Sequence, residues 1–286
     1  MKKNHSGSAL IISIIITMII ILVAIYLLDK IVPFSRDIKG IENGNIAYYK
    51  ANTALNEALL SMSISTPGYE TGSSSVVNGS GIAYQVIAMG TVLPRLGEGN
   101  SEYDKDWAIL APGKPIQLVL STGMNWSTSI FKFRVPDLNR DGNGDETLSG
   151  GTVLPIINWA LTTNGETLQA SGSQIMANNI NNTDVNLTGK NGLTLSGSAY
   201  TFDSFYTTKC GTPNACTLKL SLINPLVLTT NEIAPYLEYQ GTFNVPIPLQ
   251  TATVEAQGYA GGFRKNITRF IQQMTTNEAL DFTVFQ

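Results

Sequence analysis

The sequence predicts an α+β protein in which a long N-terminal transmembrane helix continues into an amphipathic helix, followed by a mainly antiparallel β globular head. Three observations carry this prediction. The first is a charge-free apolar run, Ala9–Leu28. The second is a repeat of small residues at helical spacing between Asn45 and Met62. The third is a series of short alternating segments, punctuated by Gly, Asn and Pro, over the rest of the chain.

The run Ala9–Leu28 has the length of a membrane span. At about 1.5 Å of rise per residue it covers about 30 Å, the thickness of the hydrocarbon core of a bilayer. A short basic leader, residues 1–7, precedes it. A cleaved secretory signal has an apolar core of about 7–15 residues and a small-residue cleavage site after it. This run is longer and leads into Asp29, so we expect the helix to stay in the finished protein.

Beyond the apolar run the sequence predicts an interrupted helix. Pro33 lacks a backbone donor, so we expect a kink or local break there, and Gly40 and Gly44 loosen the helix further. Helical spacing then returns on one face, which carries Ala47, Ala51, Ala54, Ala58 and Met62. The terminators Ser65–Gly68 follow. We therefore predict that residues 8–62 form the N-terminal helix, with residues 63–286 as the head.

The head is predicted to consist of short strands. The expected strands are Ile82–Ala88, Ile116–Leu120, Ile130–Val135, Thr152–Leu161, Leu193–Tyr206, Thr217–Leu222, Tyr236–Val245, Leu249–Gln257, Lys265–Gln273 and Asp281–Phe285. The polar segment Asn164–Asn191 lies between the predicted strands Thr152–Leu161 and Leu193–Tyr206, and we expect it to be a long exposed loop or an insertion. A soft boundary between two β subdomains is expected near it.

Composition limits the classes of function. The net charge is −3, and 14% of the residues are charged. No basic cluster alternates with aromatic residues, so we expect no nucleic-acid partner. The single histidine, His5, lies in the leader, and no nucleophile elbow or phosphate loop is present, so we expect no enzymatic activity.

Two cysteines, Cys210 and Cys216, flank a segment rich in turn-forming residues. A metal site would need further ligands, and neither another cysteine nor a nearby histidine exists, so we predict a disulfide. Such bonds persist outside the cytoplasm. The charges flanking the apolar run do not settle its orientation, whereas the cysteine pair and the short leader favour an extracytoplasmic head.

The sharpest local motif is a candidate Ca²⁺ loop. Oxygen-bearing side chains recur at alternate positions, with Gly142 at the tight turn, as in the first part of a calcium loop. The predicted ligands are Asp137, Asn139, Asp141, Asn143 and Asp145. Leu148 occupies the position of the usual final carboxylate, so Glu146 or a remote residue would have to replace it. The alternative is an Asp/Asn/Gly turn between strands.

Seven aromatic residues in the head allow two interpretations. They are Trp107, Trp126, Trp159, Tyr200, Phe202, Phe205 and Tyr206. Such side chains can line a sugar or partner site, but in strands they more often pack in the core, which is the interpretation that we prefer.

The N-terminal residues Lys2-Lys-Asn-His-Ser-Gly7, followed by Ser8-Ala-Leu-Ile-Ile12 and the long helix, resemble a type IV pilin-like protein over about the first 60 residues. The resemblance implies that a prepilin peptidase cuts after Gly7 and leaves Ser8 as the mature terminus. Major pilins carry Glu at the fifth mature position, where this chain has Ile12. The departure implies a minor pilin or pseudopilin that initiates a type IV pilus or a type II secretion pseudopilus, or lies at its tip.

In that family the partners are other pilin-like subunits, bound through the helix. The implied location is the inner or cytoplasmic membrane, and the cell surface or filament after assembly. Two other interpretations stay open. One is a surface β-domain on an uncleaved signal anchor, acting as an adhesin or carbohydrate-binding module. The other is an anchored hydrolase, which would need carboxylates clustered in a cleft.

Overall fold

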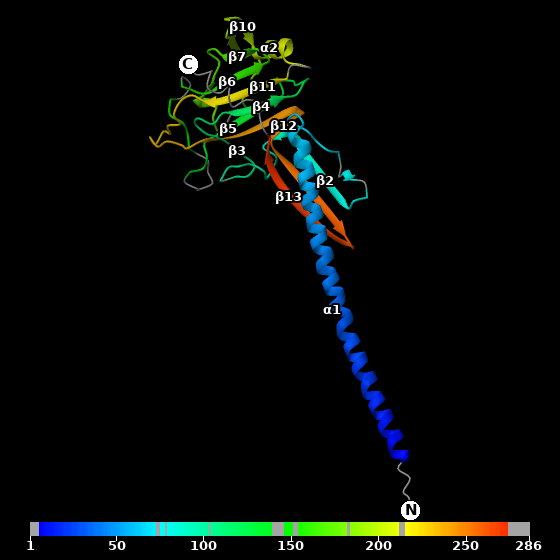
Figure 1. Ribbon diagram of the computed structural model, residues 1–286. Coiled ribbons are helices and arrows are strands. Elements are labelled where there is room, and N and C mark those ends of the chain that lie inside the picture. The colour runs from blue at the N-terminus through cyan, green and yellow to red at the C-terminus, as the bar shows by residue number, and fades with distance from the viewer. Residues whose placement is uncertain are drawn as a thin grey trace, which may run out of the picture. The chain divides into compact units, whose positions relative to one another are not determined.

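The structure is a computed structural model that describes residues 6–72, 75–77, 79–102, 104–138, 146–150, 154–181, 184–211 and 215–273. It confirms the predicted α+β fold, in which a long N-terminal helix precedes antiparallel β-sheets (Figure 1). The elements are α1 (Ser6–Ser63), β1 (Ser75–Val77), β2 (Ile82–Leu93), β3 (Ala108–Leu110), β4 (Ile116–Leu120), β5 (Ile130–Arg134), β6 (Pro155–Thr163), β7 (Glu166–Ala170), β8 (Ile175–Met176), η2 (Ala177–Asn179), β9 (Asn191–Thr194), β10 (Ala199–Thr201), α2 (Phe202–Lys209), β11 (Cys216–Leu222), β12 (Leu237–Ala260) and β13 (Phe263–Gln272).

Helix α1 is continuous, so the predicted interruption is wrong. Pro33 lies inside the helix, and Gly40 and Gly44 continue it. A proline removes one hydrogen bond of the helix and clashes with the preceding turn, at a cost of about 3 kcal/mol. A helix of 58 residues retains the remaining bonds on both sides of that position, and the apolar side chains around it favour internal hydrogen bonding.

The strands that the structure describes form two antiparallel sheets. The six-stranded sheet has the order β1-β2-β12-β13, and β3 and β5 also pair with β12. The seven-stranded sheet has the order β10-β9-β7-β6-β11-β4, and β8 pairs with β6. Strand β12 runs through Pro246 and Pro248, where the sequence predicted two separate strands. Its register with β5 ends at Thr242, before both prolines, so neither removes a hydrogen bond from that pairing.

The chain divides into two compact units. Unit 1 comprises Met1–Leu59, Ser73–Gln85 and Glu255–Thr268, and unit 2 comprises Leu60–Gly72, Val86–Val254 and Arg269–Gln286. Unit 1 contains most of α1 together with β1 and parts of β2, β12 and β13. Unit 2 contains the large hydrophobic core, in which Trp159, Phe131 and Phe202 are fully buried.

Two further expectations for the head are wrong. The predicted strand Leu193–Tyr206 is instead the end of β9, strand β10 and helix α2. Helix α2 begins at a capping box between Thr201 and Ser204, which satisfies backbone donors that a helix leaves unpaired. The segment Asn164–Asn191 is not a long loop, because β7 pairs with both β6 and β9. The last predicted strand, Asp281–Phe285, lies outside the described residues.

Candidate functional site

The first half of α1 exposes an apolar surface that the rest of the described chain leaves uncovered. The helix contains a segment of mean hydropathy 3.2 that is 0% buried, long and apolar enough to span a membrane or to serve as a signal. Between Ile11 and Leu28 its large side chains are exposed, including Ile12 at 54%, Ile20 at 62% and Leu28 at 59%. Exposed apolar surface of this extent marks a site that contacts lipid or another protein.

The predicted processing site lies at the start of this helix. Gly7 and Ser8 belong to the first turn of α1, which begins at Ser6. Nothing in the geometry tests whether the chain is cut there, so the cleavage stays a prediction.

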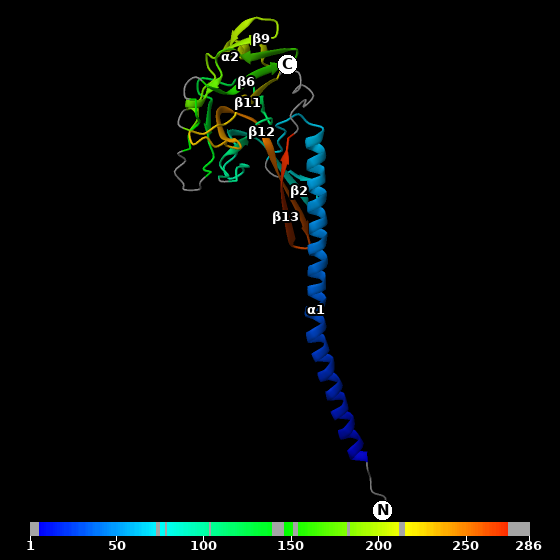
Figure 2. The ribbon, with the colours of Figure 1, turned by 90° about the vertical axis from the view of Figure 1, so that its left-hand side faces the viewer.

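The second half of α1 packs on the sheet of unit 1 through small side chains. Ala47, Ala51, Ala54 and Ala58 are each 0% exposed, as the helical repeat predicted. Ala54 packs with Ile82 of β2 and Ala256 of β12 in one apolar cluster. Figure 2 shows β2 and β13 beside this half of the helix. Alanines on the helix thus allow its backbone to approach the sheet closely.

Gly258 of β12 lies at a close approach between α1 and the sheet of unit 1. A Cβ atom at this position would lie 2.0 Å from the Ala47 carbonyl oxygen and 2.4 Å from the Ala51 nitrogen. Both are backbone atoms, which a rotamer change cannot move. Position 258 therefore accepts only glycine while helix and strand keep this spacing. The sequence around Gly258 did not predict this role, because the close approach of two segments that are distant in the chain leaves no local signal.

The tip of the β12–β13 hairpin also meets the helix. Gly261 has a φ of +53°, and a Cβ there would lie 2.2 Å from Nδ2 of the Asn43 side chain. A Cβ on Gly40 would lie 3.4 Å from the ring of Phe263, in ordinary contact. The hairpin tip is thus fixed on α1 about four residues before the alanine face begins.

The candidate Ca²⁺ loop is described only at its two ends. Asn139, Asp141, Asn143 and Asp145 lie outside the described residues, and among the described ones no three Asp, Glu, His or Cys side chains form a metal-binding group. Asp137 and Glu146 stand at the ends of the loop. Glu146 Oε1 accepts a hydrogen bond from the Leu138 nitrogen at 3.0 Å, so this carboxylate faces the start of the loop.

Asn181 joins the two ends of this loop, a role that the sequence analysis missed. Its Oδ1 accepts from the Val135 nitrogen at 2.6 Å, and its Nδ2 donates to the Glu146 carbonyl. It adopts a φ of +80°, which asparagine tolerates better than most residues. The loop is therefore closed by protein contacts at its base.

The Ca²⁺ hypothesis predicts a measurable stabilisation. If the loop binds the ion, 2 mM Ca²⁺ is about a hundredfold excess over the dissociation constant of a typical sensor-type loop. Because Ca²⁺ would then bind the folded state alone, the melting temperature should rise by several degrees. Asp141→Asn should remove most of this shift, while Asp184→Asn, outside the loop, should leave it. An equal melting temperature in Ca²⁺ and in a chelator would contradict the hypothesis.

Cys210 and Cys216 form the predicted disulfide, with a Cα–Cα distance of 5.4 Å. The Cys210 nitrogen donates to the Tyr206 carbonyl at 3.0 Å and so ends α2, and Cys216 begins β11. The bond thus joins the end of the helix to the first residue of the strand that follows.

Five of the seven aromatic residues pack in the core of the head, as the preferred interpretation predicted, whereas Trp107 and Tyr200 are half-buried. Trp126 makes edge contacts with Phe202 and Tyr206, at centroid distances of 4.6 and 5.6 Å, and Trp159 contacts Phe202 at 5.3 Å. All four rings are buried. They are therefore not available to bind a sugar.

A buried carboxylate in unit 2 is held by residues that the sequence analysis did not single out. Glu238 of β12 is 0% exposed and pairs through Oε2 with Arg134 Nε of β5 at 2.5 Å, while its Oε1 accepts from the Ser101 hydroxyl. Arg134 also pairs with Asp104 at 3.0 Å and stacks on Trp107, with Cζ 4.0 Å from the ring centroid. The cluster joins β5, β12 and the loop before β3.

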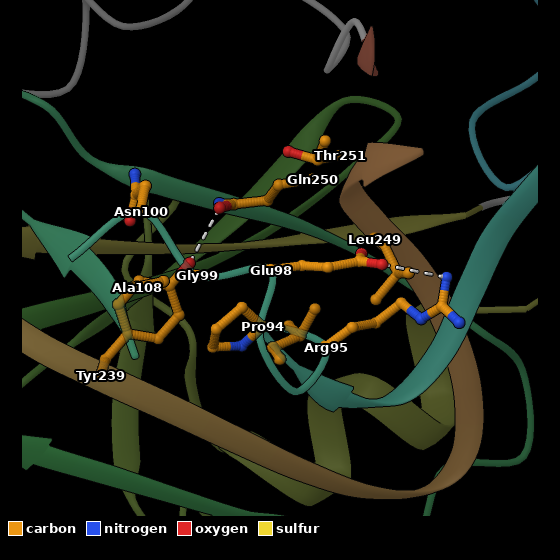
Figure 3. Close-up of a pocket in the computed structure, with 11 residues that line it drawn as sticks. Pro94, Arg95, Glu98, Gly99, Asn100, Ala108, Tyr239, Leu249, Gln250 and Thr251 are labelled. Atoms are coloured by element: carbon orange, nitrogen blue, oxygen red, sulfur yellow. Dashed lines mark hydrogen bonds and ion pairs between the residues drawn. The ribbon is translucent and has the colours of Figure 1, made fainter. Parts of the chain in front are cut away.

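A small pocket in unit 2 is lined by residues of β12 and of the segment after β2. Figure 3 shows Tyr239 and Gln250 at its wall, where the Tyr239 hydroxyl donates to Gln250 Oε1 at 2.8 Å. Its volume is about 70 Å³. Ligand pockets usually have volumes of about 300–1,000 Å³, so this one has room for water rather than for a sugar.

Burial raises the pKa of the Tyr239 phenol well above its usual value. Below about pH 9 the phenol is neutral in both the folded and unfolded chain. At higher pH the unfolded chain loses this proton while the folded protein keeps it, so the free energy of unfolding should fall. Denaturant unfolding between about pH 9 and 11 should show this fall, and Tyr239→Phe should make it shallower. Parallel curves for the two proteins would contradict the assignment.

Comparison of the chain with protein-family models, with curated proteins and with solved structures found no match.

Proposed function

We propose that the protein is a structural, pilin-like subunit that assembles through the exposed half of α1 into a type IV pilus or a type II secretion pseudopilus. The observation that carries this proposal is the division of one continuous helix into two halves. The first half exposes apolar side chains, and the second docks through alanines on the sheet of unit 1. A retained helix of this kind serves first as a membrane anchor and then as the surface that packs against similar helices.

Processing after Gly7 by a prepilin peptidase belongs to the same proposal. It would make Ser8 the first residue and leave the apolar surface intact. Ile12, at the fifth mature position, carries no charge to neutralise the amine of a neighbouring subunit, and an unpaired charge within apolar surroundings is costly. An end position in the filament avoids this cost, so we propose an initiating or tip subunit.

We propose a structural role for the head rather than an enzymatic one. Trp126, Trp159, Phe202, Phe205 and Tyr206 are buried in the core, and the pocket beside Tyr239 is small. The sequence motifs that would carry hydrolysis or phosphate chemistry are also missing.

Photo-crosslinking in the native host tests the assembly role. A benzophenone side chain at Ile20, on the exposed apolar surface, should form adducts with other pilin-like subunits. The same group at Leu195, 80% exposed on the head, is the matched control and should give none of these adducts. Adducts with lipid alone at Ile20, in cells that are assembling filaments, would favour the anchored adhesin instead.

A further inference from the structure

Strand β13 (Phe263–Gln272) forms an edge of its sheet. Among the strands that the structure describes, it pairs with β12 alone. Its side chains are exposed on both faces, apart from the half-buried Ile267 and Ile271. An edge of this length presents a row of backbone donors and acceptors that can pair with another extended segment.

The turn before β13 determines which residues present these groups. Gly261 and Gly262 have φ values of +53° and +85°, the signs that a two-residue type I′ hairpin turn requires. In such a hairpin the flanking residues, Ala260 and Phe263, form a hydrogen-bonded pair, and pairing then alternates along the strands. By this alternation Arg264, Asn266 and Thr268 direct their backbone N–H and C=O groups away from β12.

Arg264 is held in place on this outer edge. Its Cζ lies 5.8 Å from the centroid of the Tyr259 ring, and its Nε donates to Asn266 Oδ1 at 2.9 Å. The ion pairs among the described residues include neither Arg264 nor its neighbour Lys265. The terminal nitrogens of Arg264 are therefore positioned to receive a carboxylate, for which the planar guanidinium is the matching group.

The composition of β13 distinguishes a binding edge from a protected one. Proteins often place charged residues on edge strands to prevent unwanted pairing. Exposed aromatic rings do not prevent pairing at an edge, and Phe263 and Phe270 are 44% and 62% exposed. Arg264, Lys265 and Arg269 are its only charged residues. A second copy of β13 would bring a second set of cations alongside the first, which disfavours self-pairing.

We propose that β13 binds an extended acidic segment of a different protein as an added strand of the sheet. Backbone hydrogen bonds from Arg264, Asn266 and Thr268 supply affinity, and a carboxylate opposite Arg264 supplies specificity. This surface is separate from the apolar half of α1, so the inference does not depend on the assembly function proposed above.

Peptide binding to the full chain in detergent tests the inference. The probe is a fluorescent ten-residue peptide that alternates valine with glutamate, and the comparison peptide has lysine in place of glutamate. Thr268→Pro removes an outward N–H without removing a bond to β12, and Thr268→Ala keeps that N–H as the matched control. Arg264→Gln removes the charge alone.

We expect the glutamate peptide to bind saturably, with a dissociation constant below about 1 mM. Thr268→Pro should bind it at least tenfold more weakly, and Thr268→Ala should bind it as the parent does. Arg264→Gln should weaken binding of the glutamate peptide severalfold. Circular dichroism of each variant shows whether it is folded. Equal binding of the lysine peptide, full binding by folded Thr268→Pro, or no binding at about 1 mM would overturn the inference. A dimer of the chain that Thr268→Pro dissociates would also overturn it, since the occupant would then be a second copy.

Discussion

Gly258→Ala is expected to separate α1 from the sheet of unit 1. The added Cβ would lie 2.0 Å from the Ala47 carbonyl oxygen, so the helix must move away from β12 and lose the packing of its alanine face. Overpacking of this kind costs about 1–3 kcal/mol, and more where the obstacle is backbone. We expect a lower melting temperature and faster hydrogen exchange of the amides between Ala47 and Ala58.

Gly44→Ala is the matched control. Gly44 lies in the same helix, and a Cβ there meets nothing within 4 Å. Alanine in a helix is more favourable than glycine by about 0.5–1 kcal/mol, so this variant should be slightly more stable than the parent. If both glycine variants were stabilised alike, the close approach of helix and strand at Gly258 would be refuted.

Arg134→Ala is expected to destabilise unit 2 by about 2–4 kcal/mol. It leaves the buried Glu238 carboxylate without its cation, and loss of one partner of a buried ion pair typically costs about 3–5 kcal/mol. Arg134 is one-third exposed, so water can reach part of the site, which lowers the expected cost. Denaturant unfolding measures this loss directly.

A second substitution separates charge from packing in this cluster. In Arg134→Ala/Glu238→Gln the unpaired buried charge is gone, so the double variant should recover part of the lost stability. Lys132→Ala on the same strand removes an exposed ion pair with Asp184 and should change stability by less than about 1 kcal/mol. A double variant no more stable than Arg134→Ala alone would mean that the arginine acts through its packing on Trp107 rather than through its charge.

Local sequence signals were enough to predict the long N-terminal helix and the strands β2, β4, β5, β6, β11, β12 and β13. The apolar run predicted an uncovered helical surface, and the spacing of three or four residues between Ala47, Ala51, Ala54 and Ala58 predicted a buried face. Both signals are set by the period of one element. The alternation in Ile130–Val135 likewise predicted β5, with Phe131 and Phe133 buried.

The wrong predictions have two physical causes. Prolines at 33, 246 and 248 were taken as breaks, yet α1 continues through Pro33 and β12 continues through Pro246 and Pro248. Helix α2 was missed because its aromatic residues favour strands, while the capping box at Thr201 and Ser204, which specifies the helix start, was overlooked. At the prolines the local propensity was overridden, and at α2 it was misread.

Several contacts that the sequence did not predict join segments that are distant in the chain. Gly258 meets α1 across about two hundred positions, and Glu238 meets Ser101 and Arg134 across more than a hundred. No local pattern marks these pairs. Asn181, which joins the two ends of the 137–146 segment, is another example, because in sequence it is one asparagine in a polar stretch.

The mature N-terminus of the protein isolated from its native host tests the central claim most directly. Intact-mass and N-terminal analysis should find a chain that begins at Ser8 and retains the apolar half of α1. A chain that still begins at Met1 would identify a plain signal anchor. A chain that begins after Leu28 would show that the apolar helix is discarded, and either result would contradict assembly through that helix.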